Sequence, residues 1–288
     1  MIHILTYYSL VAFSFFLSIF NRKIALNIGR IFGLFMYYCI PLRKSVVKIN
    51  LCTAFPDKND KEIKKLTLQI YKHYGLLMFE FIRSHKRQVN KNIFKIDNQT
   101  KKILTSKDGF ILMTAHLGNW EMILPVINHY KKITAVVRHH NNIGGNRFFS
   151  ECRNLTNVTL ISNKGSRKKM IEALNHGEIL GLASDQNAKD RGTYINFFNR
   201  KASIPKGAGH FHYLTGKKVV IGFCILNKDL SYTVKLKEIS LNKNCEQKEN
   251  LIVELNDVYT KLLEEEIIKS PSQYFWFHKK WEKYIYNK

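Results

Sequence analysis

From about residue 109 onward, short apolar runs alternate with stretches of helical character, and no other feature of this 288-residue sequence restricts the fold as strongly. The runs predicted to be strands are GFILMTA, ITAVVR, NVTLIS, EILGLAS and KKVVIGFCIL, and helices are predicted near 119–129, 146–155, 166–176 and 206–215. A helix between two strands carries the chain back to the starting edge of a sheet, so that successive strands run parallel. The sequence therefore predicts an α/β fold with a mainly parallel central sheet covered by helices.

The segments on either side of this region complete the predicted architecture. Residues 60–87 have apolar side chains at helical spacing, and Asn59 with Glu62 is typical of a capping box at the start of a long amphipathic helix. The stretch LSYTVKLKEI alternates as a strand with one exposed face does, and we expect it to be antiparallel at a sheet edge. A last helix is predicted near 249–269 and ends before Pro271.

Two apolar segments lie at the start of the sequence. Ile4–Phe20 is a run of 17 residues without charge, which as a helix reaches roughly 26 Å against a hydrocarbon core of about 30 Å. Arg22 and Lys23 follow it, and positive flanks favour the cytoplasmic side of a membrane. The next segment, IALNIGRIFGLFMYYCIPLRK, contains Asn27 and Arg30, which suggests an interfacial helix. We expect membrane attachment rather than two core helices, and leave open whether the first segment spans the bilayer.

The chain is accordingly expected to divide near residue 45. Residues 1–45 would form membrane-anchoring or interfacial helices. Residues 46–288 would form one larger domain, with a helical lead-in over 46–105 and the α/β core over 106–288.

The charge balance points to anionic partners. Lysine and arginine number 46 against 22 aspartates and glutamates, which gives a net charge of +24. Nucleic acid, an anionic membrane surface, phosphorylated lipid and an acidic carrier protein would all be attracted. The basic residues are dispersed and no nucleic-acid-binding motif occurs, so nucleic acid is disfavoured. The five cysteines are widely spaced, as is typical of reduced thiols in a cytosol-facing protein.

The stretch LMTAHLGNWEM contains a candidate catalytic pair. It places His116 at the end of a predicted strand and Glu121 in the first turn of the helix that follows, and Gly118 between them allows a sharp turn. We expect Glu121 to reach back to one imidazole nitrogen, which would fix the tautomer and leave the other nitrogen as a base. Exposed amides at the start of the helix would favour a developing oxyanion. The alternative is a structural histidine beside a helix-start glutamate, because this spacing is common by chance.

Six stretches in series carry a resemblance to a known family. HLGNWE resembles the catalytic motif of the lysophospholipid acyltransferase superfamily, and most of all the branch of Kdo-dependent lauroyl and myristoyl acyltransferases of lipid A biosynthesis. The other similar stretches are KSVVKINLCTAFPDK, VVRHHNN, NKGSRKKMIEALNHGEILGLASDQN, NFFNRKASIPKGAG and SPSQYFWFHKKWEKY. Together they cover about residues 45–285 in the order of the family, and the series is more specific than any one of them. Asn199 stands where the family usually has a glycine.

The resemblance implies that residues 46–288 form an acyltransferase domain. The reaction would move an acyl group from an acyl carrier protein thioester to a hydroxyl of a phosphorylated lipid A precursor, at the cytoplasmic side of the inner membrane. His116 would deprotonate the hydroxyl, and Glu121 would orient and stabilise the imidazolium. Direct attack on the thioester requires no cofactor and no nucleophilic serine, and no Gly-x-Ser-x-Gly motif is present.

Several residues in the similar stretches are candidates for substrate binding. Asn119 is a candidate oxyanion donor. Arg138 is expected to contact a phosphate or the thioester region, with Asn141 in the same Arg-x-x-Asn block, and the alternative for Arg138 is a surface arginine. Asp185 and Gln186 follow the predicted strand EILGLAS, where α/β folds place ligands, and the alternative is a turn cap.

Arg200 is expected to meet a phosphate, while the neighbouring Phe197 and Phe198 either line an acyl groove or lie in the core. No metal site is expected, because the remaining histidines considered lack a carboxylate at motif spacing. These histidines are His139, His140, His210, His212 and His278.

Other functions remain open at the level of the sequence. The acceptor of an acyltransferase could instead be a lysophospholipid, an aminolipid or a glycosylated phosphoinositide. Different classes are a basic nucleic-acid-binding protein, which is disfavoured, and a non-catalytic membrane scaffold on the same fold. The sequence leaves undetermined the acyl chain length, the hydroxyl that is acylated, the dependence on Kdo and the oligomeric state.

Overall fold

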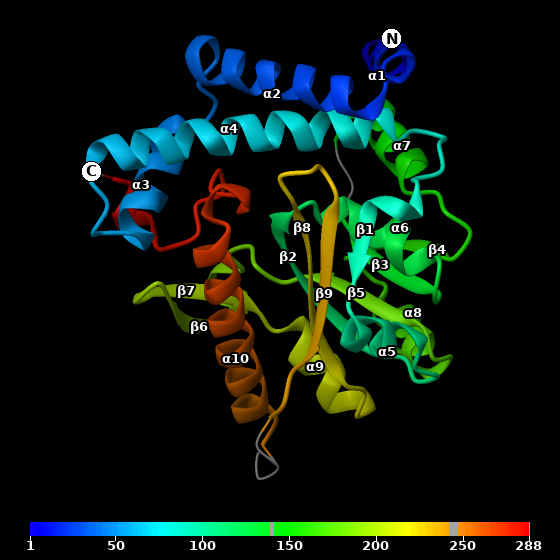
Figure 1. Ribbon diagram of the computed structural model, residues 1–288. Coiled ribbons are helices and arrows are strands. Elements are labelled where there is room, and N and C mark those ends of the chain that lie inside the picture. The colour runs from blue at the N-terminus through cyan, green and yellow to red at the C-terminus, as the bar shows by residue number, and fades with distance from the viewer. Residues whose placement is uncertain (139–140, 242–246, 288) are drawn as a thin grey trace.

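A seven-stranded sheet forms the centre of the protein (Figure 1). The computed structural model describes residues 1–138, 141–241 and 247–287. The strands of this sheet are β1 (Phe94–Ile96), β2 (Ile111–Gly118), β3 (Ile133–Val137), β4 (Val158–Ser162), β5 (Ile179–Ala183), β8 (Val219–Leu226) and β9 (Tyr232–Glu238), in the spatial order β1-β9-β8-β2-β5-β3-β4. Every neighbouring pair is parallel except β8 and β9, which confirms the predicted α/β fold with a mainly parallel sheet.

The strand β9 differs in one respect from the prediction. It runs antiparallel to β8, as its alternating sequence indicates. It is not an edge strand, however, because β1 pairs with its other side and places Phe94 opposite Tyr232. A strand of three residues is too short to produce a periodic signal, so β1 was not predicted.

Alternate side chains of the central strand β2 supply two separate cores. Ile111 and Met113 point to one face and pack with residues of α8, α9 and α10, while Leu112 points to the other and packs with residues of α5 and α6. These helices are α5 (Asn98–Thr105), α6 (Ile123–Asn128), α8 (Arg167–Asn175), α9 (Gly207–Thr215) and α10 (Lys248–Lys269). The helices predicted after residue 160 are confirmed almost to the residue. The helix predicted near 119–129 is instead a 3₁₀ turn, Trp120–Met122, followed by the short α6.

A two-stranded antiparallel sheet, β6 (Gly192–Phe197) and β7 (Arg200–Pro205), was not predicted. The turn between its strands is formed by Phe198 and Asn199, whose φ angles are 50° and 56°. Asparagine adopts this left-handed region more readily than most residues. Asn199 therefore preserves a turn for which the resemblance leads one to expect glycine.

Two long helices lie side by side across the end of the sheet where β2 terminates (Figure 1). They are α2 (Arg22–Cys39) and α4 (Asp60–Arg83), and the predicted capping box of Asn59 and Glu62 is present at the start of α4. Gly33 of α2 faces the backbone of Tyr71, and Gly75 of α4 faces the backbone of Gly33, so that a Cβ at either glycine would clash with the neighbouring helix. Glycine allows the two helix backbones to approach this closely.

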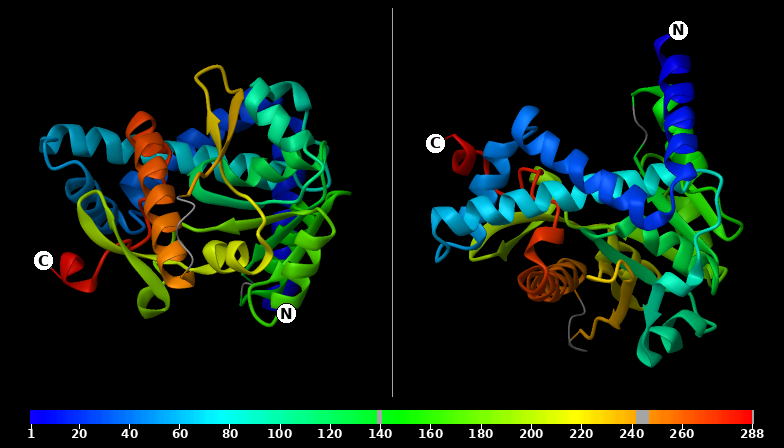
Figure 2. Two further views of the ribbon diagram at one scale, coloured as in Figure 1. Left: turned by 90° about the horizontal axis from the view of Figure 1, so that it is seen from below. Right: turned by 45° about the horizontal axis from the view of Figure 1, so that its top comes forward.

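The first helix, α1 (Ile2–Ile19), extends away from the body of the protein (Figure 2) and packs on α7 (Ile143–Cys152). It is long and apolar enough to cross a membrane, and only 17% of it is buried within the protein. The helices α2 and α3 (Lys44–Ala54) would form a second crossing only as one broken span, bent by 98°. By length and composition, α1 is thus a candidate membrane-spanning helix.

Candidate active site

His116 and Asp185 meet at the carboxyl ends of two neighbouring strands. His116 lies near the end of β2 and Asp185 two residues beyond β5, and the parallel pairing of the strands sets Thr114 opposite Ala183. The imidazole Nδ1 lies 2.7 Å from Oδ1 of Asp185. With Nδ1 protonated and donating to the carboxylate, Nε2 keeps its lone pair and can accept a proton. Gln186 places its Nε2 atom 3.4 Å from this second nitrogen.

Asp185 and His116 each favour the charged form of the other. Asp185 is 3% exposed, and burial raises the pKa of its carboxyl, but the neighbouring His116 and Lys280 lower that pKa more, to about 2. Burial lowers the pKa of His116, whereas the charge and hydrogen bond of Asp185 and the charge of Glu121 raise it more, so that it lies above its ordinary value of 6.5. Asp185 is therefore ionised at every pH at which the imidazole titrates.

The predicted contact between Glu121 and the imidazole is wrong. Both carboxylate oxygens of Glu121 accept from Arg153, at 2.7 Å and 2.6 Å, and Oε1 also accepts from the indole N–H of Trp120 at 3.0 Å. A guanidinium group offers a carboxylate two parallel charged hydrogen bonds, which a neutral imidazole cannot match. The ring of Trp120 also packs 4.8 Å from that of His116, measured between centroids. Glu121 thus acts on the imidazole through its charge rather than through a hydrogen bond.

The geometry of Asn119 does not support its expected role as an oxyanion donor. Its side chain is 1% exposed, and its Nδ2 donates to Tyr232 at 2.9 Å and to Glu80 at 3.3 Å. Its backbone N–H donates to the carbonyl of Cys224 at 2.7 Å. Asn119 instead fixes the turn that follows His116, through a buried network in which Glu80 also pairs with Arg22 of α2 at 2.6 Å.

An apolar groove of about 510 Å³ lies beside His116. The residues that line it come from α2 and the loop after it, α4, the turn after β2, α7 with its C-cap, and the C-terminal segment. They are Phe32, Gly33, Met36, Leu42, Arg43, Tyr71, Tyr74, Gly75, Leu77, Met78, Phe81, Asn119, Trp120, Glu121, Phe149, Arg153, Phe275 and Phe277. Two of them, Trp120 and Phe275, pack against the imidazole ring. Among the described residues of this lining, the acidic side chain of Glu121 is paired with Arg153.

The C-terminal segment, residues 270–287, closes the site. The N–H of Phe275 donates to the carbonyl of His116 at 2.9 Å, and the hydroxyl of Tyr74 donates to the same carbonyl at 3.3 Å. Lys280 donates to the backbone carbonyl of Asp185. The backbone of both residues of the pair is therefore held from outside the sheet.

The remaining predicted binding residues are not brought to His116. Arg138 and Asn141 are exposed on either side of residues 139–140, and Arg200 is exposed at the start of β7. None of the three lines the groove. His139 and His140 lie outside the described residues.

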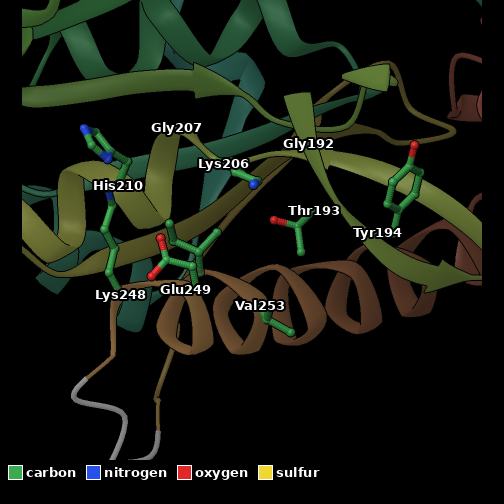
Figure 3. Close-up of a pocket in the computed structure, with 10 residues that line it drawn as sticks. Gly192, Thr193, Tyr194, Lys206, Gly207, His210, Lys248, Glu249 and Val253 are labelled. Atoms are coloured by element: carbon green, nitrogen blue, oxygen red, sulfur yellow. The ribbon is translucent and has the colours of Figure 1, made fainter. Parts of the chain in front are cut away.

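A second cavity, of about 690 Å³, lies between β6, α9 and the start of α10 (Figure 3). Its lining includes Lys206, His210 and Lys248, together with the acidic Glu249. Within the part of the chain that the structure describes, neither His116 nor the residues found against its ring are in this lining, so the cavity is separate from the candidate active site.

Sequence reasoning missed Arg153, Glu80 and Lys280. Arg153 and Glu80 stand in no motif, and their partners lie 32 and 39 residues away along the chain. Lys280 stands in the similar stretch SPSQYFWFHKKWEKY, where one of two adjacent lysines is buried and the other exposed. No local pattern in the sequence identifies these partners.

Comparison with known proteins identifies the family of the chain. The family model described as "Bacterial lipid A biosynthesis acyltransferase" matches residues 1–283. The chain is similar to the lipid A biosynthesis palmitoleoyltransferase of Escherichia coli (strain K12) and to a lipid A biosynthesis acyltransferase of Shigella flexneri. Each is 21% identical over 252 residues, which cover 83% of this chain and 79% of the relative.

Proposed function

Because the chain belongs to the bacterial lipid A biosynthesis acyltransferase family, we propose that it moves a fatty acyl chain from an acyl carrier protein thioester to a hydroxyl of a phosphorylated lipid A precursor, with His116 as the general base. The observation that carries the proposal is the His116–Asp185 pair beside an apolar groove. A base with one nitrogen held by a carboxylate and the other available is suited to removing a proton from an alcohol.

The steps follow from the tautomer that Asp185 selects. Nε2 of His116 takes the proton of the acceptor hydroxyl as its oxygen attacks the thioester carbonyl. The C–S bond then breaks, and the departing thiolate takes a proton from the imidazolium. Asp185 stabilises that imidazolium by direct contact, and Glu121 stabilises it by its charge. The reaction is complete without an acyl-enzyme and without a cofactor.

The groove is the proposed site of the acyl chain. Its lining is mostly aliphatic and aromatic, and a volume of about 510 Å³ is within the range of small-molecule sites. Its contact with His116 through Trp120 and Phe275 would bring the carbonyl end of a bound chain to the base. The groove is lined in part by α2, which is one of the two apolar N-terminal helices, and by α4.

We place the enzyme at the inner membrane, with its catalytic domain on the cytoplasmic side. Residues 1–45 would anchor or lie in the membrane, and residues 46–288 would form the acyltransferase domain. The exposed apolar side chains of α1 and α2, among them Phe15, Ile31 and Phe35, support this placement. The net charge of +24 suits the anionic membrane, the phosphorylated acceptor and the acidic carrier protein.

The test is acyl transfer by the purified protein in detergent micelles. Acyl carrier protein thioesters serve as donors and phosphorylated lipid A precursors as acceptors, and product masses are measured. We expect His116→Ala to abolish transfer while membrane association is retained, and His129→Ala, at an exposed histidine, to leave it unchanged. Unchanged turnover in His116→Ala would remove the catalytic assignment. Transfer to lysophospholipid but not to lipid A precursors would contradict the proposed acceptor.

A further inference from the structure

We propose that Lys280 is a positioning residue of this active site, whose buried ammonium group holds the backbone of Asp185 and opposes protonation of the His116 imidazole. The inference rests on the proposed function, because it gives a reason why His116 can serve as a base. Lys280 makes no contact with the imidazole and would act through Asp185 and through its charge.

The first observation is the burial of the lysine. Lys280 is 2% exposed, whereas its neighbour Lys279 is exposed. Lysine is almost never fully buried unless its charge is compensated, because removing an ammonium group from water is costly. A cation retained in this position is therefore balanced by a nearby anion.

The second observation is that the surrounding chain fixes the lysine in place. The N–H of Lys280 donates to the hydroxyl of Tyr286 at 2.7 Å, and that hydroxyl donates to Oδ1 of Asn50 at 2.7 Å. The amide nitrogen of Asn50, which is fully buried in α3, donates to the carbonyls of Trp276 and His278 at 2.6 Å and 2.8 Å. The C-terminal segment is thus clamped to α3 on both sides of Lys280.

The third observation is where the ammonium group points. Its Nζ donates to the backbone carbonyl of Asp185 and lies 4.8 Å from the centroid of the Phe197 ring. The carboxylate of the same aspartate accepts from His116. Asp185 therefore binds Lys280 through its backbone carbonyl and His116 through its carboxylate. A protonated imidazole would place a second positive charge on the other side of Asp185 from the ammonium group of Lys280.

The charges around the imidazole show why such a cation matters. Burial lowers the pKa of His116, Asp185 and Glu121 raise it, and Lys280 lowers it. His278 also faces the cluster, and its pKa is lowered to about 4 by burial and by Lys280, so it is neutral near pH 7. Tyr274 faces Asp185, and burial and that carboxylate raise its pKa well above 10, so it is neutral as well. Arg153 pairs with Glu121, and Lys280 is the cation that lies against Asp185.

The ammonium group of Lys280 loses its proton at a lower pH than an exposed lysine does. Burial lowers its pKa to about 8, although Asp185 raises it. Below that pH the ammonium group is charged and opposes protonation of His116. Above it the lysine is neutral and no longer opposes protonation of His116.

The decisive experiment is the pH profile of kcat/KM for three variants that are assayed with the wild type. We expect Lys280→Met to move the acid limb upward by about one pH unit, because it removes a like charge near the imidazole. Lys280→Arg, which keeps the charge, should leave the limb close to its wild-type position. Lys279→Met is the matched control at the adjacent exposed lysine, and its profile should equal that of the wild type.

A folded Lys280→Met enzyme with an unmoved acid limb would overturn the proposal, even if its kcat had fallen, because loss of packing alone lowers turnover without moving the limb. If Lys280→Met does not fold, the wild-type protein decides. The ¹³Cε1 resonance of His116, assigned with His116→Gln, should show a second inflection near pH 8 as Lys280 loses its proton. A single inflection up to pH 10 would reject the proposal. This titration requires no acyl transfer, so it separates a failure of the role of Lys280 from a failure of the proposed function.

Discussion

Nδ1 of His116 lies 2.7 Å from Oδ1 of Asp185, across two neighbouring parallel strands and a separation of 69 residues in the chain. The contact joins two stretches that the sequence presents as separate motifs. In the proposed mechanism the orienting role therefore falls to the aspartate after β5, while Glu121 remains in its bidentate pair with Arg153. Four predictions for variants and one for the wild type follow from this arrangement and from the groove beside it.

Replacement of Asp185 by asparagine should lower kcat by at least about 100-fold, because the imidazole loses the anion that selects its tautomer and stabilises its charged form. The KM for the acceptor should change little, since Asp185 is buried behind the histidine. Steady-state kinetics check this. Asp190→Asn, at a nearby exposed aspartate, should be silent. Equal effects of Asp185→Asn and Asp190→Asn would contradict an orienting role for Asp185.

The wild-type activity should rise with pH along an acid limb that lies above 6.5. The pKa of His116 is raised above that value, and a histidine that carries a proton cannot accept another, so activity is absent below the pKa and present above it. Asp185, whose pKa is about 2, adds no inflection in this range. A profile of kcat/KM with its acid limb well below 6.5 would show that His116 is not the titrating base.

The pair of Glu121 and Arg153 should contribute to stability as well as to the site. Their side chains are 14% and 19% exposed, so Arg153→Ala leaves a largely buried carboxylate without its cation and should lower the free energy of unfolding by about 3 kcal/mol. Chemical denaturation measures this. The double variant Glu121→Gln with Arg153→Met should recover most of the loss, and Lys168→Ala, from an exposed ion pair, should have little effect. If the double variant is no more stable than Arg153→Ala, the loss does not come from an unpaired charge.

The close packing of α2 on α4 should tolerate no side chain at Gly33. In Gly33→Leu the new side chain meets the backbone of Tyr71, so the helices must separate, at a cost of about 1–3 kcal/mol. Acyl transfer should fall with stability, since Gly33 also lines the groove. Gly145→Ala is the control, because the nearest atom to its Cβ is an ordinary 3.6 Å away. Comparable thermal stability of the two variants would show that the contact between α2 and α4 is not tight.

The groove should determine which acyl chains are transferred. Met78→Trp adds volume to its lining and should shift the preference toward shorter acyl donors, as measured by competition between thioesters of different length. Ile268→Trp, at an exposed position on α10, serves as the control for a surface tryptophan. An unchanged preference in Met78→Trp, with normal folding, would place the acyl chain elsewhere.

Much of the fold was predictable because its signals are local. The period of the apolar residues identified the strands β2, β3, β4, β5, β8 and β9 and the helices α8, α9 and α10. The elements that were missed have weak or ambiguous local signals: β1 has three residues, and the hairpin of β6 and β7 turns through two non-glycine residues with positive φ. The same limit applied to the site. His116 was identified from its strand-end position. Glu121 was assigned as its partner because it lies only five residues away in the sequence.

The sequence by itself determined the class of fold, the family and the histidine at the end of β2, because periodicity and motif order are properties of neighbouring residues. Only the tertiary structure decided what each side chain touches. Parallel pairing of β2 with β5 brings Asp185 to the imidazole, the fold of α7 carries Arg153 to Glu121, and the clamped C-terminal segment buries Lys280 behind the pair. Asp185 rather than Glu121 contacts the histidine because Arg153 binds the carboxylate of Glu121, and Arg153 comes from a distant part of the sequence.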